Sequence, residues 1–233
     1  MKNGYNSAPA GSDSGIYCEH LWKVFPSPDG PVRALCDVTC EIPRGTLAWI
    51  QGASGSGKST LLSLLGALER PTKGGVYVFG KELNALTGEC ASAFRRHQVG
   101  YLISDLALVP HLSGIENVAL SLMFDGLPAT EIQARALAQL EAFDVSHRAR
   151  HRPNQMSLGE RVRVTLARAL VRNPPLLLAD EPTANLDAEN AERVISLLQS
   201  LSIDGTTVVV ASHDDRFQKV SKLNLHLSHG KFT

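Results

Sequence analysis

Short apolar runs and longer stretches with helical spacing alternate along this chain, and together these patterns predict an α/β fold. Strands are predicted at residues 16–24, 32–42, 46–50, 74–79, 99–103, 176–180 and 206–211. Helices are predicted at residues 57–68, 113–123, 128–143, 158–172 and 188–201. The runs at 176–178 and 208–210 are continuously apolar, which is typical of parallel strands that are buried on both faces. A block of helices therefore interrupts an α/β core.

The predicted elements divide the chain into a tail and one domain. Residues 1–15 are rich in Gly, Ser, Asn, Pro and Ala, which favours a loose and flexible tail. The length of the remainder, 16–233, fits a single domain in which the helical block, at about 104–172, is inserted in the α/β core. Ser113 and Glu116 have the spacing of a capping box and mark the start of one helix in this block.

The charge balance argues against a nucleic-acid partner. Lys and Arg number 23 and Asp and Glu number 23, so the formal net charge is zero, whereas nucleic-acid binders usually carry a basic excess. No apolar run approaches the roughly 20 residues that a membrane-spanning helix needs, and the N-terminal residues lack a signal-peptide pattern. We therefore expect a cytosolic chain that reaches a membrane only through a partner.

Four cysteines raise the question of a metal site. Cys36 and Cys40 are spaced like one half of a zinc site, but no second pair of Cys or His residues completes the pattern. We therefore expect that these two residues, together with Cys18 and Cys90, are reduced thiols packed in strands.

The strongest chemical signal is the segment 52–60, which fits the pattern G-x-x-x-x-G-K-[ST] between an apolar strand and a helix. Gly55 and Gly57 allow the backbone to curl so that several N–H groups point at one phosphate. Lys58 is then expected to reach the β- and γ-phosphates of ATP, and Ser59 to give an oxygen to Mg²⁺. A plain Gly/Ser turn before a helix is the alternative, and the agreement of motif and context argues against it. The residues of this loop that are predicted to bind nucleotide are Gly52, Ser54, Gly55, Gly57, Lys58, Ser59 and Thr60.

Two carboxylates follow the apolar strand at 176–180, at the end of the strand where ligand chemistry occurs in parallel sheets. Asp180 is expected to hold Mg²⁺, and Glu181 to polarise the attacking water. His213 follows the next strand, and we expect it to contact the γ-phosphate or to orient Glu181. The alternatives are a strand that simply emerges into solvent and a structural histidine. The candidate catalytic residues are therefore Glu181, His213 and Lys58.

Further segments resemble the ABC ATPase family, from about residue 16 to the C-terminus. Residues 157–160 and the helix after them are similar to the family's signature motif, 185–187 to its D-loop and 212–214 to its H-switch. Phe25 falls where the family has an aromatic side chain that stacks on adenine, and a core aromatic is the alternative. The resemblance implies a P-loop NTPase core with a mostly parallel sheet, an N-terminal antiparallel β subdomain and an α-helical subdomain.

The resemblance also implies a head-to-tail homodimer of ATPase subunits, in which each ATP lies between the phosphate loop of one subunit and the signature segment of the other. Ser157 and Gly159 would then meet the nucleotide at a helix N-terminus, where an anion is favoured. A capping box between Ser157 and Glu160 is the alternative, and both roles are compatible because they use the same helix end.

Finer details resemble one subgroup of the family. Residues 108–118 and 177–187 look like the ATPases of lipoprotein-releasing, macrolide-exporting and related systems. In that subgroup, two ATPase subunits act beneath integral membrane transporter subunits that relay motion across the membrane. The resemblance therefore implies an ATPase that uses ATP and Mg²⁺, powers export or extraction, and is attached through membrane subunits to the cytoplasmic face of the inner membrane.

The sequence departs from the family at two places. Ser104 and Asp105 stand where a Gln usually helps to hold Mg²⁺. Ser104 is accordingly a candidate metal ligand, although Ser is too short to replace Gln directly, so that Asp105 or a bridging water is the other option. Leu158 replaces a signature glycine, where it either crowds the nucleotide or packs at the dimer seam. A backbone with positive φ would tolerate Leu poorly at this position.

Other functions stay open at this point. A regulatory ABC ATPase with weak hydrolysis, which acts mainly by ATP-dependent dimer closure, is supported by Ser104 and Leu158. Soluble ABC proteins of DNA repair or translation usually carry two such domains or long coiled-coil insertions, and neither appears here. A small-molecule kinase would leave the segment 157–160 unexplained.

Overall fold

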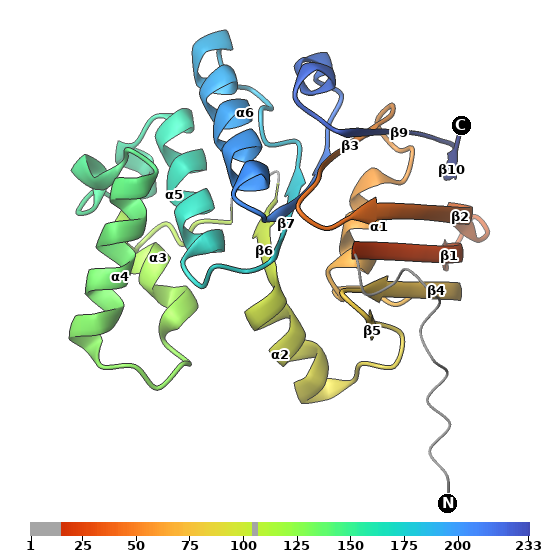
Figure 1. Ribbon diagram of the computed structural model, residues 1–233, viewed down its shortest axis with the longest axis horizontal. Helices are drawn as coiled ribbons and strands as arrows, with labels where there is room; N and C mark the ends of the chain where they lie inside the picture. Colours follow the sequence, from red (N-terminus) through yellow and green to blue (C-terminus); the bar gives the residue numbers. More distant parts are fainter. Residues whose placement is uncertain (1–14, 104–106) are drawn as a thin grey trace, which may run out of the picture.

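Two β-sheets with different strand directions organise the chain (Figure 1). The structure is a computed structural model, which describes residues 15–103 and 107–233. The tail predicted for residues 1–15 therefore lies outside the described residues except for Gly15, and so do Ser104 and Asp105. Across the described ranges, none of the helices has both the length and the apolar character that crossing a membrane requires.

The first sheet is antiparallel and has the strand order β2-β1-β4-β5. Its strands are β1 (Gly15–Phe25), β2 (Val32–Pro43), β4 (Lys73–Val78) and β5 (Lys81–Glu82). Apolar side chains on its inner face, among them Ile16, Leu21 and Ile42, are fully buried. This sheet confirms the N-terminal antiparallel β subdomain that the family resemblance implies.

The second sheet is mostly parallel and has the strand order β10-β9-β3-β8-β7-β6. Its strands are β3 (Leu47–Gln51), β6 (Val99–Leu102), β7 (Leu176–Asp180), β8 (Thr207–Ala211), β9 (Leu223–Ser228) and β10 (Lys231–Phe232). Strand β10 is antiparallel to β9. Asp180 at the end of β7 pairs with Ala211 at the end of β8, so the residues after both strands emerge at the same edge of the sheet.

Some of the α-helices in the described part form a separate block beside the parallel sheet. The α-helices of this part are α1 (Lys58–Leu65), α2 (Gly88–Gln98), α3 (Gly114–Ala119), α4 (Ala129–Ala142), α5 (Leu158–Leu170) and α6 (Ala188–Ile203). Short 3-10 helices occur at Leu120–Leu122, Ser146–Arg148, Pro153–Gln155 and Asp215–Lys219. Helices α3, α4 and α5 lie between β6 and β7 in sequence and form one block beside the parallel sheet (Figure 1). This block confirms the α-helical subdomain implied by the resemblance.

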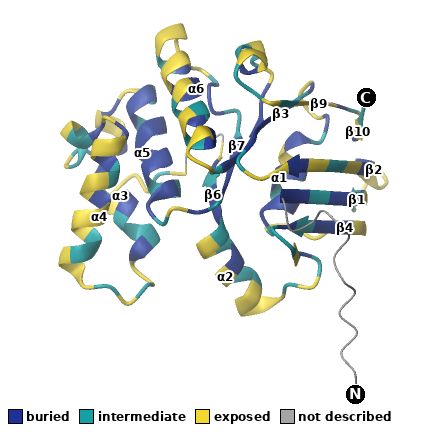
Figure 2. Cartoon of the chain, in the orientation of Figure 1, coloured by how far each residue is buried: buried dark blue, intermediate teal, exposed yellow. Residues whose placement is uncertain are grey.

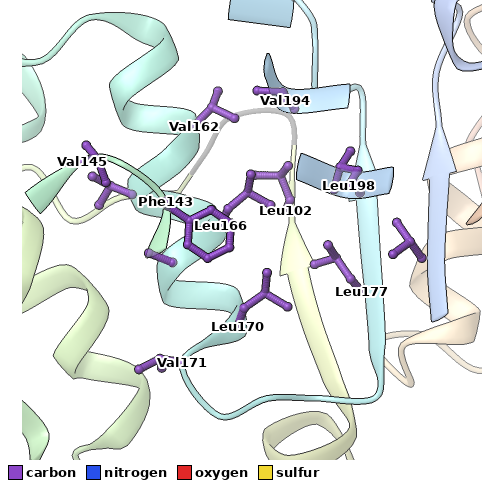
Figure 3. Close-up of a cluster of buried hydrophobic side chains, with 14 of the residues drawn as sticks. Leu102, Phe143, Val145, Val162, Leu166, Leu170, Val171, Leu177, Val194 and Leu198 are labelled. Carbon is purple, nitrogen blue, oxygen red and sulfur yellow. The ribbon is translucent and has the colours of Figure 1, made fainter. Parts of the chain in front are cut away.

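The parallel sheet is buried on both faces, as its dark central strands in Figure 2 show. Leu177 belongs to a cluster with side chains of α4, α5 and α6, and Figure 3 shows it near Leu170 and Leu198 in that cluster. The next residue, Leu178, belongs to a second cluster, which contains Leu61 of α1 and apolar side chains of the antiparallel sheet. Each such side chain contributes about 1.5–3 kcal/mol when it is fully buried. These contacts hold α1, and the loop before it, against both sheets.

Among the α-helices and strands that the structure describes, α2, β5, β9 and β10 are absent from the sequence prediction. Helix α2 buries only Phe94, so no apolar stripe marks it as a helix. Strand β9 alternates Leu223, Leu225 and Leu227 with polar residues, which is a strand pattern that the prediction overlooked. Strand β5 has two residues, and β10 also has two, which is too short for a periodic signal.

The helices predicted at 57–68 and 113–123 are much shorter than expected. The helix predicted at 57–68 ends at Leu65, because Ala67 adopts a left-handed conformation with φ of 54° that a helix cannot continue through. The helix predicted at 113–123 is α3 followed by a 3-10 helix. The predicted capping box of Ser113 and Glu116 is confirmed at the start of α3.

The four cysteines are free thiols. Cys18 in β1 is buried, and so is Cys36 in β2, while Cys40 is half-buried opposite Cys18. Cys90 lies exposed in α2, so the expectation that it is packed in a strand is wrong. The reason is that α2 is mostly polar and has little apolar surface with which to bury a thiol.

Candidate active site

A cavity of about 700 Å³ opens where the phosphate loop and the ends of β7 and β8 meet. It brings together the predicted catalytic residues and most of the loop residues predicted to bind nucleotide. Four lining residues were not predicted from the sequence: Ser56 of the loop, and three residues at the start of β2. The turn before β2 is the sole local signal for those three. The lining residues are Val32, Arg33, Ala34, Ser54, Gly55, Ser56, Gly57, Lys58, Ser59, Thr60, Asp180, Glu181 and His213.

The phosphate loop lies tightly against its neighbours at two glycines. A Cβ atom on Gly52 would lie 2.2 Å from the carbonyl oxygen of Leu227, and one on Gly57 would lie 2.4 Å from that of Ala34. Gly57 also has φ of 108°, which side chains rarely allow. Helix α1 begins directly afterwards at Lys58, and no side chain caps it. Its first N–H groups are therefore left available for an anionic ligand.

The side chain of Lys58 is held inside the phosphate loop by hydrogen bonds to the loop backbone. This side chain is 7% exposed, and its Nζ donates hydrogen bonds to the carbonyl oxygens of Gly52 (2.7 Å) and Ala53 (3.2 Å). The same Nζ lies 3.8 Å from Oε1 of Glu181. An ammonium group has three protons, so this arrangement leaves donor capacity that faces the carboxylate and the cavity.

Ser59 and Asp180 form the pair that was predicted to hold a metal ion. Asp180 is half-buried, and burial raises the pKa of its carboxyl group, an effect that a hydrogen bond with Ser59 opposes. The neighbouring Glu181 raises the pKa further, while Lys58 lowers it. A divalent cation beside Asp180 would stabilise the charged form of this carboxylate, so the residues present fit Mg²⁺. No group of three or more His, Cys, Asp or Glu side chains in the described ranges is placed to hold a metal, so phosphate oxygens would have to supply further ligands.

Glu181 is held by the segment that follows β8. Its backbone has φ of 48°, a strained conformation for this residue type, and its N–H donates to the carbonyl oxygen of Ala211 at 2.8 Å. Its Oε2 accepts a hydrogen bond from Oγ of Ser212 at 3.0 Å and lies 2.9 Å from Nδ1 of His213. His213 itself is 74% exposed. The structure thus places His213 beside Glu181. This position fits the second of the two roles expected from the sequence, which is to orient Glu181.

Phe25 lies at the end of β1 and is half-buried, in register with Val32 of β2. Val32 lines the cavity and is 54% exposed, whereas Phe25 does not belong to the lining. Nζ of Lys23 lies 4.7 Å from the centre of the Phe25 ring, so this face of the ring has a cation–π contact. The ring is not a fully buried core aromatic, and its stacking on adenine stays a prediction.

The signature segment lies apart from the cavity within this chain, since neither Ser157 nor Gly159 lines it. Ser157 is the N-cap of α5 and forms the capping box with Glu160 that was offered as the alternative. A Cβ atom on Gly159 would lie 2.4 Å from Oδ1 of Asn190, so α5 closely approaches α6 at this point. Leu158 is half-buried in the first turn of α5 and does not have positive φ, so a Leu is free of backbone strain there.

Glu160 binds three partners at the start of α5. Its Oε1 accepts a hydrogen bond from Nε of Arg148 at 2.8 Å and lies 3.2 Å from Nε2 of His147, while its Oε2 accepts one from the N–H of Ser157 at 2.7 Å. Burial alone would raise the pKa of Glu160, but these hydrogen bonds lower it from 4.5 to about 2. The charged carboxylate therefore stabilises the fold, and this contribution is lost as pH falls from about 4.5 through about 2.

Replacing Glu160 with Gln is expected to reduce the free energy of unfolding by about 2–3 kcal/mol near pH 7, because the amide loses the charge that Arg148 binds. Urea unfolding at a series of pH values measures this difference. It should shrink as pH is lowered from about 5 to about 2, because the unfolded chain takes up a proton on Glu160 near pH 4.5 whereas the folded chain does so only near pH 2. Glu141→Gln, on the exposed face of α4, is the matched control. A difference that stayed constant with pH would show that lost packing, and not lost charge, is responsible.

Comparisons with known proteins identify the family of this chain. The family model described as ABC transporter matches residues 35–184, which is more than half of the chain. A dimeric structure of the ATP-binding cassette MJ0796 in a post-hydrolysis state, bound to ADP and Pi, has a TM-score of 0.87 and 36% sequence identity, and covers 93% of this chain and 96% of that one. A second dimeric structure of MJ0796, described as a bacterial ABC transporter cassette, matches with the same values. This chain is therefore a member of the ABC transporter family and corresponds to the ATP-binding cassette of that family.

Proposed function

We propose that this chain is the ATP-hydrolysing subunit of an ABC transporter or mechanotransmission complex, and that it powers export or extraction through integral membrane subunits. The observation that carries the proposal is the meeting of Lys58, Glu181 and the uncapped N-terminus of α1 around one cavity. The likeness of 108–118 and 177–187 to lipoprotein-releasing and macrolide-exporting ATPases supports the finer assignment to that subgroup.

The phosphate loop binds the terminal phosphates of ATP in this proposal. Its backbone N–H groups and the start of α1 supply fixed dipoles, and Lys58 adds a full positive charge. Phe25 stacks on the adenine ring at the far end of the nucleotide, next to Val32, which already lines the cavity. When phosphate binds, it accepts a hydrogen bond from the N–H group of Lys58 that faces the cavity.

Ser59 and Asp180 are the described residues that would hold Mg²⁺, and Ser104, outside the described residues, is the proposed third. When bound, Mg²⁺ offsets the negative charge of the phosphate oxygens. Ser59 offers a neutral hydroxyl oxygen, and Asp180 offers a carboxylate whose pKa is raised, mainly by burial. Oxygen ligands of this kind are the ones that Mg²⁺ prefers.

Glu181 acts as the general base towards the attacking water. Its Oε2 is engaged by Ser212 and His213, and its Oε1 faces Lys58 and the cavity, so Oε1 is the atom that accepts the proton. His213 holds the carboxylate in place through Nδ1 and keeps an exposed ring beside the phosphate site. Phosphoryl transfer depends mainly on positioning and charge stabilisation, which this arrangement supplies.

A second copy of the chain completes the site. Ser157 and Gly159 of that copy contribute the N-terminus of α5, where the helix dipole favours the γ-phosphate. Ser157 is exposed and lies outside the cavity of its own chain. It is therefore accessible to a nucleotide that is bound in the cavity of another subunit. The similar cassette MJ0796 is dimeric in both solved structures, which supports the same assembly here.

Purification tests the proposed attachment to membrane subunits at the cytoplasmic face of the inner membrane. An affinity-tagged chain extracted from membranes in mild detergent should retain integral membrane polypeptides, and this complex should hydrolyse ATP faster than the isolated chain. The same preparation with Glu181→Gln is the control, which should keep the polypeptides and lose the activity. Recovery of nucleic acid in place of membrane polypeptides would contradict the proposal.

A further inference from the structure

The two oxygens of the Glu181 carboxylate have different surroundings. Oε2 accepts hydrogen bonds from Oγ of Ser212 (3.0 Å) and the N–H of His213 (3.4 Å), and lies 2.9 Å from Nδ1 of His213. Oε1 lies 3.8 Å from Nζ of Lys58. The donors that come from the segment after β8 therefore all engage one oxygen, and the other oxygen remains directed at Lys58.

Ser212 is the most firmly anchored of these donors. It is fully buried, its N–H donates to the carbonyl oxygen of Ile50 at 3.2 Å, and its own carbonyl oxygen accepts from Nε1 of Trp49 at 3.0 Å. Both partners lie in β3, the strand that leads into the phosphate loop. The Ser212 backbone is consequently fixed relative to the loop, in contrast to His213, whose side chain is 74% exposed.

The direction of the Ser212 hydroxyl proton is also determined. Oγ of Ser212 accepts a hydrogen bond from the N–H of Asp214 at 3.1 Å. A hydroxyl group has a single proton, and with Oγ already serving as acceptor for Asp214, that proton is directed at Oε2 of Glu181. A hydrogen bond to an ionised acceptor is about twice as strong as a neutral one.

Asp214 is in turn held by two further segments. Its Oδ2 accepts hydrogen bonds from Oγ1 of Thr183 at 2.7 Å and from Nη2 of Arg216 at 2.7 Å. Burial alone would raise the pKa of Asp214, but the hydrogen bonds from Arg216 and Thr183 lower it to about 2, so it stays ionised. Thr183 belongs to the segment between β7 and α6, and Nη1 of Arg216 donates to the carbonyl oxygen of Ala188 at 3.5 Å. The chain of contacts therefore links the start of α6 to Ser212.

We propose that Ser212 is a positioning residue, which holds Oε2 of Glu181 so that Oε1 is presented to the attacking water. Thr183 and Asp214 support this role by fixing the N–H group that orients the Ser212 hydroxyl. The inference rests on the proposed role of Glu181 as the general base. It gives a role in hydrolysis to a buried serine that does not line the cavity.

The test compares Ser212→Ala with Ser212→Thr in steady-state hydrolysis of Mg²⁺-ATP. Loss of the hydroxyl should lower kcat about ten- to a hundredfold, because a hydrogen bond to a charged group is lost. The KM for ATP should change less than about twofold, since Ser212 does not touch the nucleotide cavity. Ser212→Thr keeps the hydroxyl and should recover most of kcat. Ser200→Ala, on the exposed face of α6, is the matched control and should behave as wild type.

A double variant shows whether Ser212 acts through Glu181. In a Glu181→Gln background, Ser212→Ala should cause little further loss of turnover, because the base is already absent. An equal loss in both backgrounds, or a parallel loss of ATP affinity, would overturn the inference. So would a wild-type kcat for Ser212→Ala alongside a collapsed rate for Glu181→Gln. Near-normal turnover of Glu181→Gln alone would instead remove the proposed function on which the inference rests.

Thr183→Val provides a second route to the same conclusion should Ser212→Ala fail to fold. It removes the hydroxyl that donates to Asp214 while it keeps the side-chain volume, and Arg216 continues to hold Asp214. We expect a decrease in kcat of about two- to fivefold with unchanged KM, because the Asp214 N–H is then less firmly placed. A wild-type kcat for Thr183→Val would refute the supporting role of the Thr183–Asp214 contact.

Discussion

Replacing Glu181 with Gln is expected to lower the turnover of ATP by about 10²–10⁴-fold while the affinity for ATP stays close to that of the wild type. The amide has the size of the carboxylate and still accepts a hydrogen bond from Ser212, so the cavity keeps its shape. It is unable to take a proton from the attacking water, however, which is the role that we propose for Glu181. Phosphate release at saturating Mg²⁺-ATP, together with equilibrium nucleotide binding, separates the two effects.

The same variant should accumulate as an ATP-bound dimer, because bound ATP is no longer removed. Light scattering during gel filtration should give twice the mass of the monomer in Mg²⁺-ATP, and adding Ser157→Arg should restore the monomer by blocking the seam. Glu189→Gln, exposed on α6, is the matched control for the loss of a carboxylate. Near-normal turnover in Glu181→Gln would remove Glu181 from the role of base, and an ATP-bound monomer would contradict the proposed dimer.

Replacing Lys58 with Ala is expected to weaken ATP binding by about 10- to 100-fold and to lower hydrolysis at least as much. A charged hydrogen bond to phosphate contributes about 1.5–3 kcal/mol, and its loss accounts for the change in affinity. The loop should also become looser, because the carbonyl oxygens of Gly52 and Ala53 lose the donor that joins them. Titration calorimetry with Mg²⁺-ADP measures the affinity without turnover.

Lys81→Ala, in the exposed strand β5, is the control for a general loss of positive charge. It should bind nucleotide as the wild type does. If Lys58→Ala also bound nucleotide with unchanged affinity, Lys58 would not face the phosphates and the assignment of the loop would be untenable.

Local sequence signals were sufficient where one segment contains all the information. The phosphate loop is such a case, because the glycines, Lys58 and the following apolar helix lie within a few residues of one another. The end of β7 is another, since a continuous apolar run places Asp180 at the edge of a parallel sheet. The start of α5 is also evident, because Ser157 and Glu160 have the spacing of a capping box, which the structure confirms.

Contacts between distant segments required the structure. The contact of Ser212 with Glu181 depends on β7 and β8 being neighbours in the sheet, and no local pattern contains that order. The start of β2 reaches the cavity for a similar reason, because Gly57 lies against the carbonyl of Ala34. Helix α2 escaped prediction because a helix that buries a single residue, Phe94, has almost no apolar periodicity.

The most direct test of the central claim is a crystal structure of this chain with Mg²⁺ and a non-hydrolysable ATP analogue. We predict that the terminal phosphates lie among the backbone N–H groups of residues 52–60, beside Nζ of Lys58 and close to Glu181. A nucleotide bound anywhere else, or no bound nucleotide after soaking at millimolar concentration, would contradict the account.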